Sequence, residues 1–467
     1  MEPYSSAHQQ IGKIRSGKVC AADLVGQSLD RISEIDSSGY GLNSIIALSP
    51  PLKEANSGKN IDLPLAGLPV LIKDNIETVG LPGSAGSLAF EKYPVLVDSP
   101  IAARLRAAGA EIIGATNLSE WANIRSTKST SGWSGLGGLT ASAWIHERSA
   151  GGSSSGSGAA ISAGLVSLAV GTETDGSIIC PASLNGCVGI KPTVGSVPRD
   201  GVIPISGSQD SPGSMARTVK DSALLLEIMM GKSGLVDATS EERILKIGVV
   251  KSWITNHVGT DLLFEKAASR LAKFGIALIE IDLASPDADT GKDEYEVMLH
   301  ELSDDLGIYL ANRCDENLLT LADVIRFNRE NSSRELQFFG QELFEQALLL
   351  GGRSHEYETK RARNLTWATS TLEKGLEEVD FLIGTTYSPA WISTLGLGDD
   401  YSKSSWITMA SAIAGWPIGC IPMGLTEGLP VGLGVVSRKH DEIGLVNAMA
   451  QIESALGIGT LEPTFIK

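Results

Sequence analysis

Two serine-bearing loops and one lysine are the residues of this chain whose types and positions could perform nucleophilic chemistry. Ser153 lies in a glycine- and serine-rich loop over residues 151–158, and Ser177 lies in a second loop over residues 171–183. Lys73 lies upstream, in an otherwise apolar stretch that we predict as a strand. A buried lysine can act as a base, because desolvation disfavours its ammonium form and lowers its pKa. The three elements could therefore supply a nucleophile, a relay and a base without a histidine.

The second loop could also stabilise negative charge on a reacting carbonyl. Its consecutive backbone N–H groups can point into one concavity, and each such donor typically lowers a barrier by ~3–4 kcal/mol. The residues concerned are Thr174, Asp175, Gly176 and Ser177. The alternative is a plain turn between a strand and a helix. Lys73 likewise has an alternative, because a lysine in an apolar strand can extend its amine to the surface or pair with Asp74.

The first loop has three other interpretations. Residues 151–158 could form a flexible Gly/Ser loop, and the phosphate-binding pattern Gly-x-x-x-x-Gly-Lys-Ser/Thr is absent. Residues 152–156 also match the G-x-S-x-G elbow of α/β-hydrolases, with Ser154 as the nucleophile. That elbow needs a preceding buried strand, which residues 145–150 resemble poorly, and a late histidine, for which His440 is the candidate.

Composition and charge limit the classes of partner. The chain has 467 residues and a formal net charge of −17, which disfavours nucleic acid and anionic membranes as partners. We expect no membrane span, because no window reaches ~18 uninterrupted apolar residues, and the start lacks the pattern of a signal peptide. The five cysteines form no C-x-x-C pair, which is typical of reduced thiols in a cytoplasmic protein.

The sequence predicts no metal and no organic cofactor. The six histidines are scattered along the chain, and none lies in a spacing that would build a ligand set with other residues. Cys180 and Cys187 are two thiols without a second pair, so we interpret them as small core residues.

Hydrophobic periodicity predicts an α/β protein. We expect strands at 68–73, 111–114, 246–250, 277–281 and 381–384, and helices at 100–108, 262–274 and 441–456. Residues 159–170 read as a close-packed helix followed by a short strand that ends at Gly171. Residues 246–281 form one βαβ unit, and residues 296–350 are mostly helical. Ser177 would then lie just beyond a strand's carboxyl end, where open α/β sheets place their ligands.

At these residues the chain resembles the amidase signature family. The similarity covers residues 65–76, 114–123, 131–138 and nearly all of 151–221, and it continues weakly to the C-terminus. Within the family the chain is most similar to peptide amidases, which share the motif Thr172-Glu173-Thr174-Asp175-Gly176-Ser177. The resemblance implies a large mixed central β-sheet flanked by helices on both faces. It implies one amidase domain over residues 1–467, with a signature core at about 65–221 and a helical substrate-pocket region at about 296–375.

The resemblance also implies roles for individual residues. Ser177 stands at the family's nucleophile, Ser153 at the bridging serine that follows a cis peptide bond, and Lys73 at the terminal base. The backbone N–H groups of Thr174, Asp175, Gly176 and Ser177 stand at its oxyanion hole. The reaction implied is acyl transfer from an amide to Ser177, followed by hydrolysis of the acyl-enzyme.

Departures from the family pattern bear on the substrate. Many relatives carry an arginine two or three residues after the nucleophile, where this chain has Ile179 and Cys180. This argues against a negatively charged substrate and favours small neutral carboxamides or peptide C-terminal amides. Two alternatives remain: the A subunit of a glutamyl-tRNA amidotransferase, which is a glutaminase, and an inactive binding protein with an amidase fold. We expect pocket walls from residues 123–138, residues 296–350 and the loop around Trp391.

Overall fold

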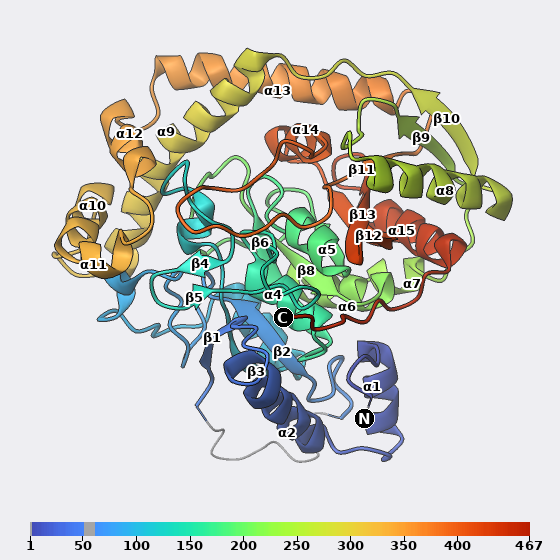
Figure 1. Cartoon of the computed structure of the whole chain (residues 1–467), viewed down its shortest axis with the longest axis horizontal. Helices are drawn as coiled ribbons and strands as arrows, with labels where there is room; N and C mark the ends of the chain where they lie inside the picture. Colours follow the sequence, from blue (N-terminus) through green and yellow to red (C-terminus); the bar gives the residue numbers. More distant parts are fainter. Residues whose placement is uncertain (1, 51–60) are drawn as a thin grey trace.

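A computed structural model describes residues 2–50 and 61–467 of the chain. Its centre is one mixed sheet of 11 strands, which runs through the middle of the molecule (Figure 1). In spatial order the strands are β1 (Ile45–Leu48), β3 (Glu111–Thr116), β2 (Pro69–Lys73), β6 (Leu168–Glu173), β8 (Ser211–Ala216), β7 (Val188–Lys191), β12 (Ile418–Thr426), β13 (Leu429–Val436), β11 (Phe381–Thr385), β9 (Lys246–Val250) and β10 (Ala277–Ile281). A separate ribbon pairs β4 (Trp133–Ser134) with β5 (Gly138–Leu139).

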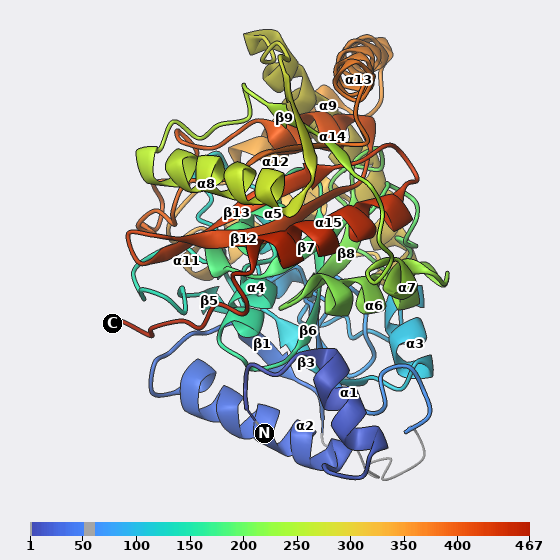
Figure 2. The same cartoon turned by 90° about the vertical axis from the view of Figure 1, so that its right-hand side faces the viewer.

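Helices cover both faces of this sheet (Figure 2). They are α1 (Ala7–Arg15), α2 (Ala21–Arg31), α3 (Pro100–Ala107), α4 (Ser155–Ser162), α5 (Ile179–Asn185), α6 (Val219–Met230), α7 (Leu235–Ala238), α8 (Val258–Phe274), α9 (Ala288–Arg313), α10 (Leu321–Glu330), α11 (Ser332–Glu335), α12 (Glu342–Leu350), α13 (His355–Gly375), α14 (Ile407–Ala414) and α15 (Glu442–Leu456). Short helical turns are η1 (Ile32–Ser37), η2 (Leu88–Phe90) and η3 (Glu120–Asn123). The predicted α/β class, with a mixed sheet between two helical layers, is confirmed.

Strand alternation decides which side chains of β2 meet which helices. Val70 and Ile72 belong to the core that includes α3, α6 and α15, whereas Leu71 belongs to the core that includes α4, α5 and α14. Because side chains of a strand alternate between faces, Lys73 lies on the same face as Leu71. The lysine is therefore directed towards the two helices that follow the serine loops.

Several predicted elements are confirmed. The strand at 68–73 is β2, the helix at 100–108 is α3, and the βαβ unit is the parallel pair β9 and β10 joined by α8. The prediction for residues 159–171 was wrong at both boundaries: α4 already begins at Ser155, and β6 continues to Glu173.

Close packing explains the glycine at position 156, within the glycine- and serine-rich stretch. A Cβ atom at Gly156 would lie 2.2 Å from the Ser44 carbonyl oxygen and 2.6 Å from the Asn117 carbonyl oxygen. Only a residue without a side chain fits there, so the glycine serves the approach of this helix to the neighbouring backbone rather than flexibility.

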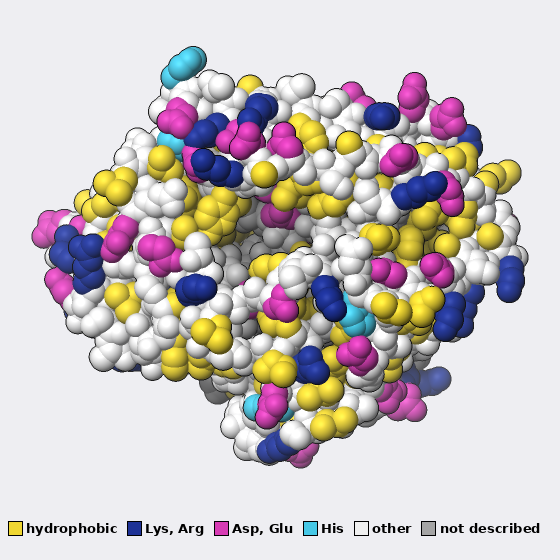
Figure 3. All heavy atoms as spheres, turned by 45° about the horizontal axis from the view of Figure 1, so that its top comes forward, with side chains coloured by type: hydrophobic (Ala, Val, Ile, Leu, Met, Phe, Trp, Pro, Cys, Tyr) yellow, Lys and Arg dark blue, Asp and Glu magenta, His cyan; other side chains and the backbone are white. Residues whose placement is uncertain are grey.

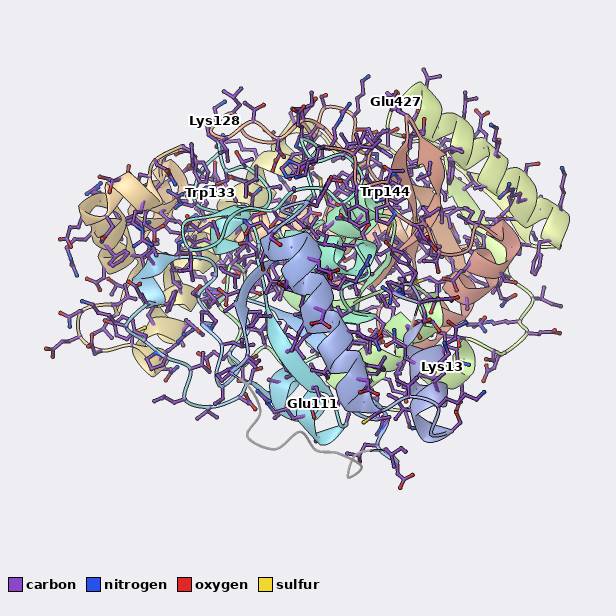
Figure 4. All side chains as sticks on the ribbon, turned by 60° about the horizontal axis from the view of Figure 1, so that its bottom comes forward. Lys13, Glu111, Lys128, Trp133, Trp144 and Glu427 are labelled. Carbon is purple, nitrogen blue, oxygen red and sulfur yellow. The ribbon has the colours of Figure 1, made fainter. Side chains whose placement is uncertain are left out.

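The helices α9, α10 and α12 contribute to a separate apolar core at the edge of the molecule. Leucines of α9 pack with residues of α10 and α12, including Leu302, Leu306, Val324 and Phe344. The helices α9 and α13 lie side by side at the top of Figure 1. Figure 4 turns the bottom of this view forward: α2 lies in front of the sheet near Glu111, at the start of β3, and Lys128 and Trp133 lie at the upper left.

Candidate active site

Lys73 is the last residue of β2 and is completely buried. Its Nζ lies 2.8 Å from Ser153 Oγ, 3.0 Å from Ser154 Oγ and 2.9 Å from Thr172 Oγ1. It also lies 3.2 Å from the Thr172 carbonyl oxygen. Asp74 takes no part in this group, because its carboxylate accepts hydrogen bonds from the backbone N–H groups of residues 83 and 84. The structure thus joins the predicted strand lysine to the first serine loop.

The contacts of Ser154 fix the direction of its hydrogen bonds. Its hydroxyl lies 3.0 Å from the Thr172 carbonyl oxygen, which can only accept, and 3.2 Å from the Thr172 backbone N–H, which can only donate. Ser154 therefore donates to that carbonyl, and its remaining lone pair accepts from Lys73. With its proton held by the backbone, Ser154 is unavailable as a nucleophile.

The histidine required by the elbow interpretation lies elsewhere. His440 contributes its backbone N–H to Thr193 Oγ1 at 2.9 Å, and over residues 2–50 and 61–467 no hydrogen bond joins its ring to Ser154. The geometry around Ser154 therefore contradicts a Ser154–His440 pair. The candidate nucleophile that remains open to solvent is the serine of the second loop.

Hydrogen-bond counting also orients the amine of Lys73. A neutral amine has two N–H donors and one lone pair. One N–H is donated to Ser154 Oγ. The other can be donated to Thr172, which offers its carbonyl oxygen and its Oγ1. Thr172 Oγ1 also accepts from Asn75 Nδ2 at 3.0 Å. In that arrangement the lone pair faces the hydroxyl of Ser153 at 2.8 Å, and the geometry permits a proton to pass between the two groups.

Burial changes the proton affinity of the amine. It lowers the pKa of Lys73 to about 7, while the negative charges of Asp210 and Glu173 raise it in part. A substantial fraction of the amine is therefore neutral at neutral pH, in contrast to an exposed lysine with a pKa of ~10.4.

The second serine loop lies between β6 and α5. Ser177 is partly exposed, and its carbonyl oxygen accepts a hydrogen bond of 3.1 Å from the Ser154 N–H, which links the two loops. The peptide bond between Gly152 and Ser153 is cis, as the family resemblance implies. No described residue forms a hydrogen bond with the Ser177 hydroxyl, so its pairing with Ser153 stays a prediction.

Two backbone N–H groups of this loop have no acceptor among the described residues, those of Asp175 and Ser177. The N–H between them, that of Gly176, is directed at the Glu173 carboxylate. Glu173 lies below the loop and accepts from the N–H groups of Ile178 and Ile179 at 2.7 and 2.9 Å. Burial raises the pKa of Glu173, and the charge of Lys191 and hydrogen bonds from the backbone, including that of the Gly176 N–H, oppose this rise.

Several residues of this site were missed by sequence reasoning. Thr172 and Asn75 contact the lysine or its partner, and Tyr387 lies against Gly176, where a Cβ atom would be 2.3 Å from its hydroxyl oxygen. Thr172 and Asn75 lie within the motifs already singled out, which was an available signal. Tyr387 comes from the distant loop after β11, and no local pattern marks it.

A hollow opens on the face below α9 and α13, with acidic and apolar side chains on its walls (Figure 3). Two of the predicted pocket walls, residues 123–138 and the loop around Trp391, are joined by Asp399. Its carboxylate accepts from the Ser131 N–H at 3.0 Å and the Ser131 hydroxyl at 2.7 Å, and from the Tyr401 hydroxyl at 3.0 Å. Trp391 packs edge-on against Tyr401 at 5.1 Å between ring centroids. The loop of residues 387–401 is thereby fixed to the segment before β4.

Two classes of feature are missing from the described part of the chain. No group of three or more His, Cys, Asp or Glu side chains there is arranged to hold a metal ion. No described helix is both long enough and apolar enough to cross a membrane.

Comparisons with known proteins agree along nearly the whole chain. A family model described as amidase matches residues 23–446. The A subunit of the glutamyl-tRNA(Gln) amidotransferase of Methanosarcina barkeri is 31% identical over an alignment of 489 residues, which covers 99% of both chains. A probable amidase of Arabidopsis thaliana is 31% identical, covering 94% of this chain and 87% of the relative. The native peptide amidase of Stenotrophomonas maltophilia matches with a TM-score of 0.87 and 34% identity over 99% of both chains.

Proposed function

Because the chain belongs to the amidase signature family and is an enzyme that acts on amide C–N bonds, we propose that it hydrolyses peptide C-terminal amides or small neutral carboxamides. The observation that carries this proposal is the buried Lys73 amine 2.8 Å from Ser153, at a site whose open serine is Ser177. The similarity to a peptide amidase at 34% identity supports the same substrate class.

The proposed reaction proceeds by proton relay and acyl transfer. Ser153 takes the proton of Ser177 and passes its own to neutral Lys73, while Ser177 Oγ attacks the amide carbonyl carbon. The N–H groups of the 174–177 loop stabilise the oxyanion. Protonated Lys73 returns its proton through Ser153 to the leaving amine as the C–N bond breaks. Water then repeats the relay on the ester and releases the acid.

Ammonia release from a panel of amides tests this proposal. We expect turnover of a dipeptide amide and no turnover by Ser177→Ala, together with loss of labelling by a serine-directed fluorophosphonate. Labelling that persists on Ser177→Ala would show that another residue is the nucleophile. We also propose that the enzyme acts in the cytoplasm, a location that its five free cysteines favour.

The amidotransferase relatives support a second candidate function, release of ammonia from glutamine within a larger assembly. Ile179 and Cys180 are both buried and place no arginine near the nucleophile, which disfavours a substrate with a free carboxylate. Glutamine in the same panel separates the two functions. A kcat/KM for glutamine above that for the dipeptide amide would favour the second.

A further inference from the structure

Asp175 and Ser177 are the two partly exposed residues of the segment 171–180, and the rest of this segment is buried. Gly176 separates them. Glu173, in contrast, lies beneath the loop with 1% of its surface exposed. Asp175 is therefore the acidic residue of the loop that keeps some exposed surface beside the candidate nucleophile.

Neighbouring residues hold Asp175 and its loop in place. A Cβ atom at Gly176 would lie 2.3 Å from the Tyr387 hydroxyl oxygen and 3.7 Å from Thr408 Oγ1. Burial and the charge of Glu173 raise the pKa of Asp175 to about 6, while the Thr408 hydroxyl lowers it by hydrogen bonding. The Asp175 side chain is thus held by Thr408, and the backbone of its loop at Gly176 is packed against Tyr387.

One oxygen of this carboxylate lacks a donor. Oδ1 of Asp175 is shielded from water and has no hydrogen-bond partner in the part of the chain that the structure describes. Buried acceptors in folded proteins are almost always paired. A ligand N–H bound beside Ser177 would supply the missing donor.

The surrounding charges favour an N–H donor. Glu294 of α9 is 4% exposed and accepts from Gln209 Nε2 at 3.0 Å, and burial and the charge of Asp175 raise its pKa well above the ordinary value. The cations that act on these two carboxyl groups are Lys191, on Asp175, and Arg361, on Glu294. A ligand N–H group here would satisfy the unpaired acceptor of Asp175, whereas a ligand carboxylate would bring a third carboxyl group and no donor.

We infer that Asp175 Oδ1 accepts a hydrogen bond from the α-nitrogen of the substrate, so that the site selects amides of amino acids and peptides over simple carboxamides. The α-nitrogen is two bonds from the carbonyl carbon, and Asp175 is two residues from Ser177, so one short substrate can reach both. The donor is an N–H group, supplied either by an acylated α-nitrogen or by a free α-ammonium. This inference rests on the proposed amide hydrolysis.

Four related amides test the inference by ammonia release. They are N-acetyl-phenylalaninamide, its α-N-methyl form, its analogue with CH₂ in place of the α-N–H, and phenylalaninamide with a free amine. We expect wild-type kcat/KM to be about 10-fold or more higher with an N–H than with CH₂ or N-methyl, since the acceptor is charged. In Asp175→Ala this ratio falls to near one. Asp175→Asn, which keeps a carbonyl acceptor, retains part of it.

The controls separate substrate contact from support of the loop. Asp200→Ala removes an exposed carboxylate outside the site and should leave the ratio at its wild-type value, and thermal melting checks that each variant is folded. An equal kcat/KM for the N–H, CH₂ and N-methyl amides in the wild type would overturn the inference. So would an equal loss on all of them in Asp175→Ala. Ammonia release from the CH₂ analogue shows that amide hydrolysis itself stands even then.

The free amine separates the two sources of the donor. A higher kcat/KM for phenylalaninamide than for its N-acetyl form identifies the ammonium as the donor, and the reverse identifies the amide N–H. Either result supports the inference if the preference is lost in Asp175→Ala. Absence of ammonia release from all four amides would overturn the proposed hydrolysis and this inference together.

Discussion

Two lysines of this molecule are completely buried at strand ends, Lys73 at the end of β2 and Lys191 at the end of β7. Burial lowers the pKa of both amines, to about 7 for Lys73 and about 8 for Lys191. Their partners differ. Lys73 lies among three hydroxyl groups, whereas Lys191 Nζ donates to two backbone carbonyl oxygens, that of Trp416 at 2.6 Å and that of Pro192 at 3.2 Å.

This difference separates a lysine that could act as a base from one whose partners offer it no proton. A carbonyl oxygen accepts a hydrogen bond but has no proton to give, so the hydrogen-bond partners of Lys191 cannot pass a proton to it. A hydroxyl can both donate and accept, so Lys73 can exchange a proton with Ser153. A lowered pKa is therefore insufficient evidence for a catalytic lysine, and the chemistry of the hydrogen-bond partners makes the distinction.

Removal of each amine should give the largest contrast. Lys73→Ala should lower the acylation rate by on the order of 10³-fold or more, because no other base contacts Ser153 among the described residues. Lys191→Met should retain most of the rate and instead lose about 1–3 kcal/mol of unfolding free energy, because two buried carbonyl groups lose their donor. Single-turnover kinetics and denaturant unfolding measure the two effects. Comparable rate losses in both variants would remove the distinction.

Replacement by a permanent cation tests what Lys73 contributes. Lys73→Arg keeps the positive charge but cannot deprotonate, so its acylation rate should be nearly as low as that of Lys73→Ala. The measurement is the same single-turnover assay, with melting temperature as the folding control. If Lys73→Arg kept most of the wild-type rate, the lysine would act as a fixed charge and the base would lie elsewhere.

The pH dependence should follow the lysine beside the serines. Since the reactive form is the neutral amine, kcat/KM should rise about 10-fold per pH unit below 7 and level off above about 7. The carboxyl groups of Asp210 and Asp175 each have a pKa of about 6, so their titration also affects the rate below pH 7. Because the Lys191 charge lowers the pKa of Asp175, Lys191→Met should change the profile near pH 6 but leave the lysine midpoint near 7. Loss of the midpoint near 7 in this variant would show that the titration belongs to Lys191.

The smallest effect should come from the serine that orients the amine. Ser154→Ala removes the acceptor of one Lys73 N–H, so the lone pair is less strictly directed at Ser153. We expect a loss of about 10-fold in kcat/KM, far below that of Ser153→Ala. Steady-state kinetics on one amide compares the two variants. Equal losses would contradict the assignment of separate roles to the adjacent serines.

Much of the site could be predicted because its groups lie in short motifs. Lys73 is recognisable as a charged residue in an apolar strand. The two serine loops are recognisable by their glycines, which include Gly152 and Gly176. The structure brings Lys73 to Ser153 as the prediction required, while the contact between Ser153 and Ser177 stays a prediction. The elbow around Ser154 was already disfavoured in sequence by its poor preceding strand, and the structure contradicts it, because the Ser154 hydroxyl donates to a backbone carbonyl.

Local signals were weaker where contacts are distant. The strands β7, β8, β12 and β13 were not predicted, although they form the middle of the sheet. Tyr387 and Thr408 reach Gly176 from more than 200 residues away along the chain, so no spacing rule links them. The single-domain organisation also stays a prediction.

The sequence by itself determined which reactive groups are present, namely the two serine loops and the lysine in an apolar strand. It also determined a net charge that disfavours anionic partners. It also determined the alternation that turns Lys73 to the face of the serine loops. Only the tertiary structure decided which of two similar buried lysines meets hydroxyl groups, which adjacent serine is free to relay a proton, and which oxygen of Asp175 is left unpaired. The physical reason is that hydrogen bonds at a buried site join segments far apart in the chain, and their direction follows from the full set of neighbours.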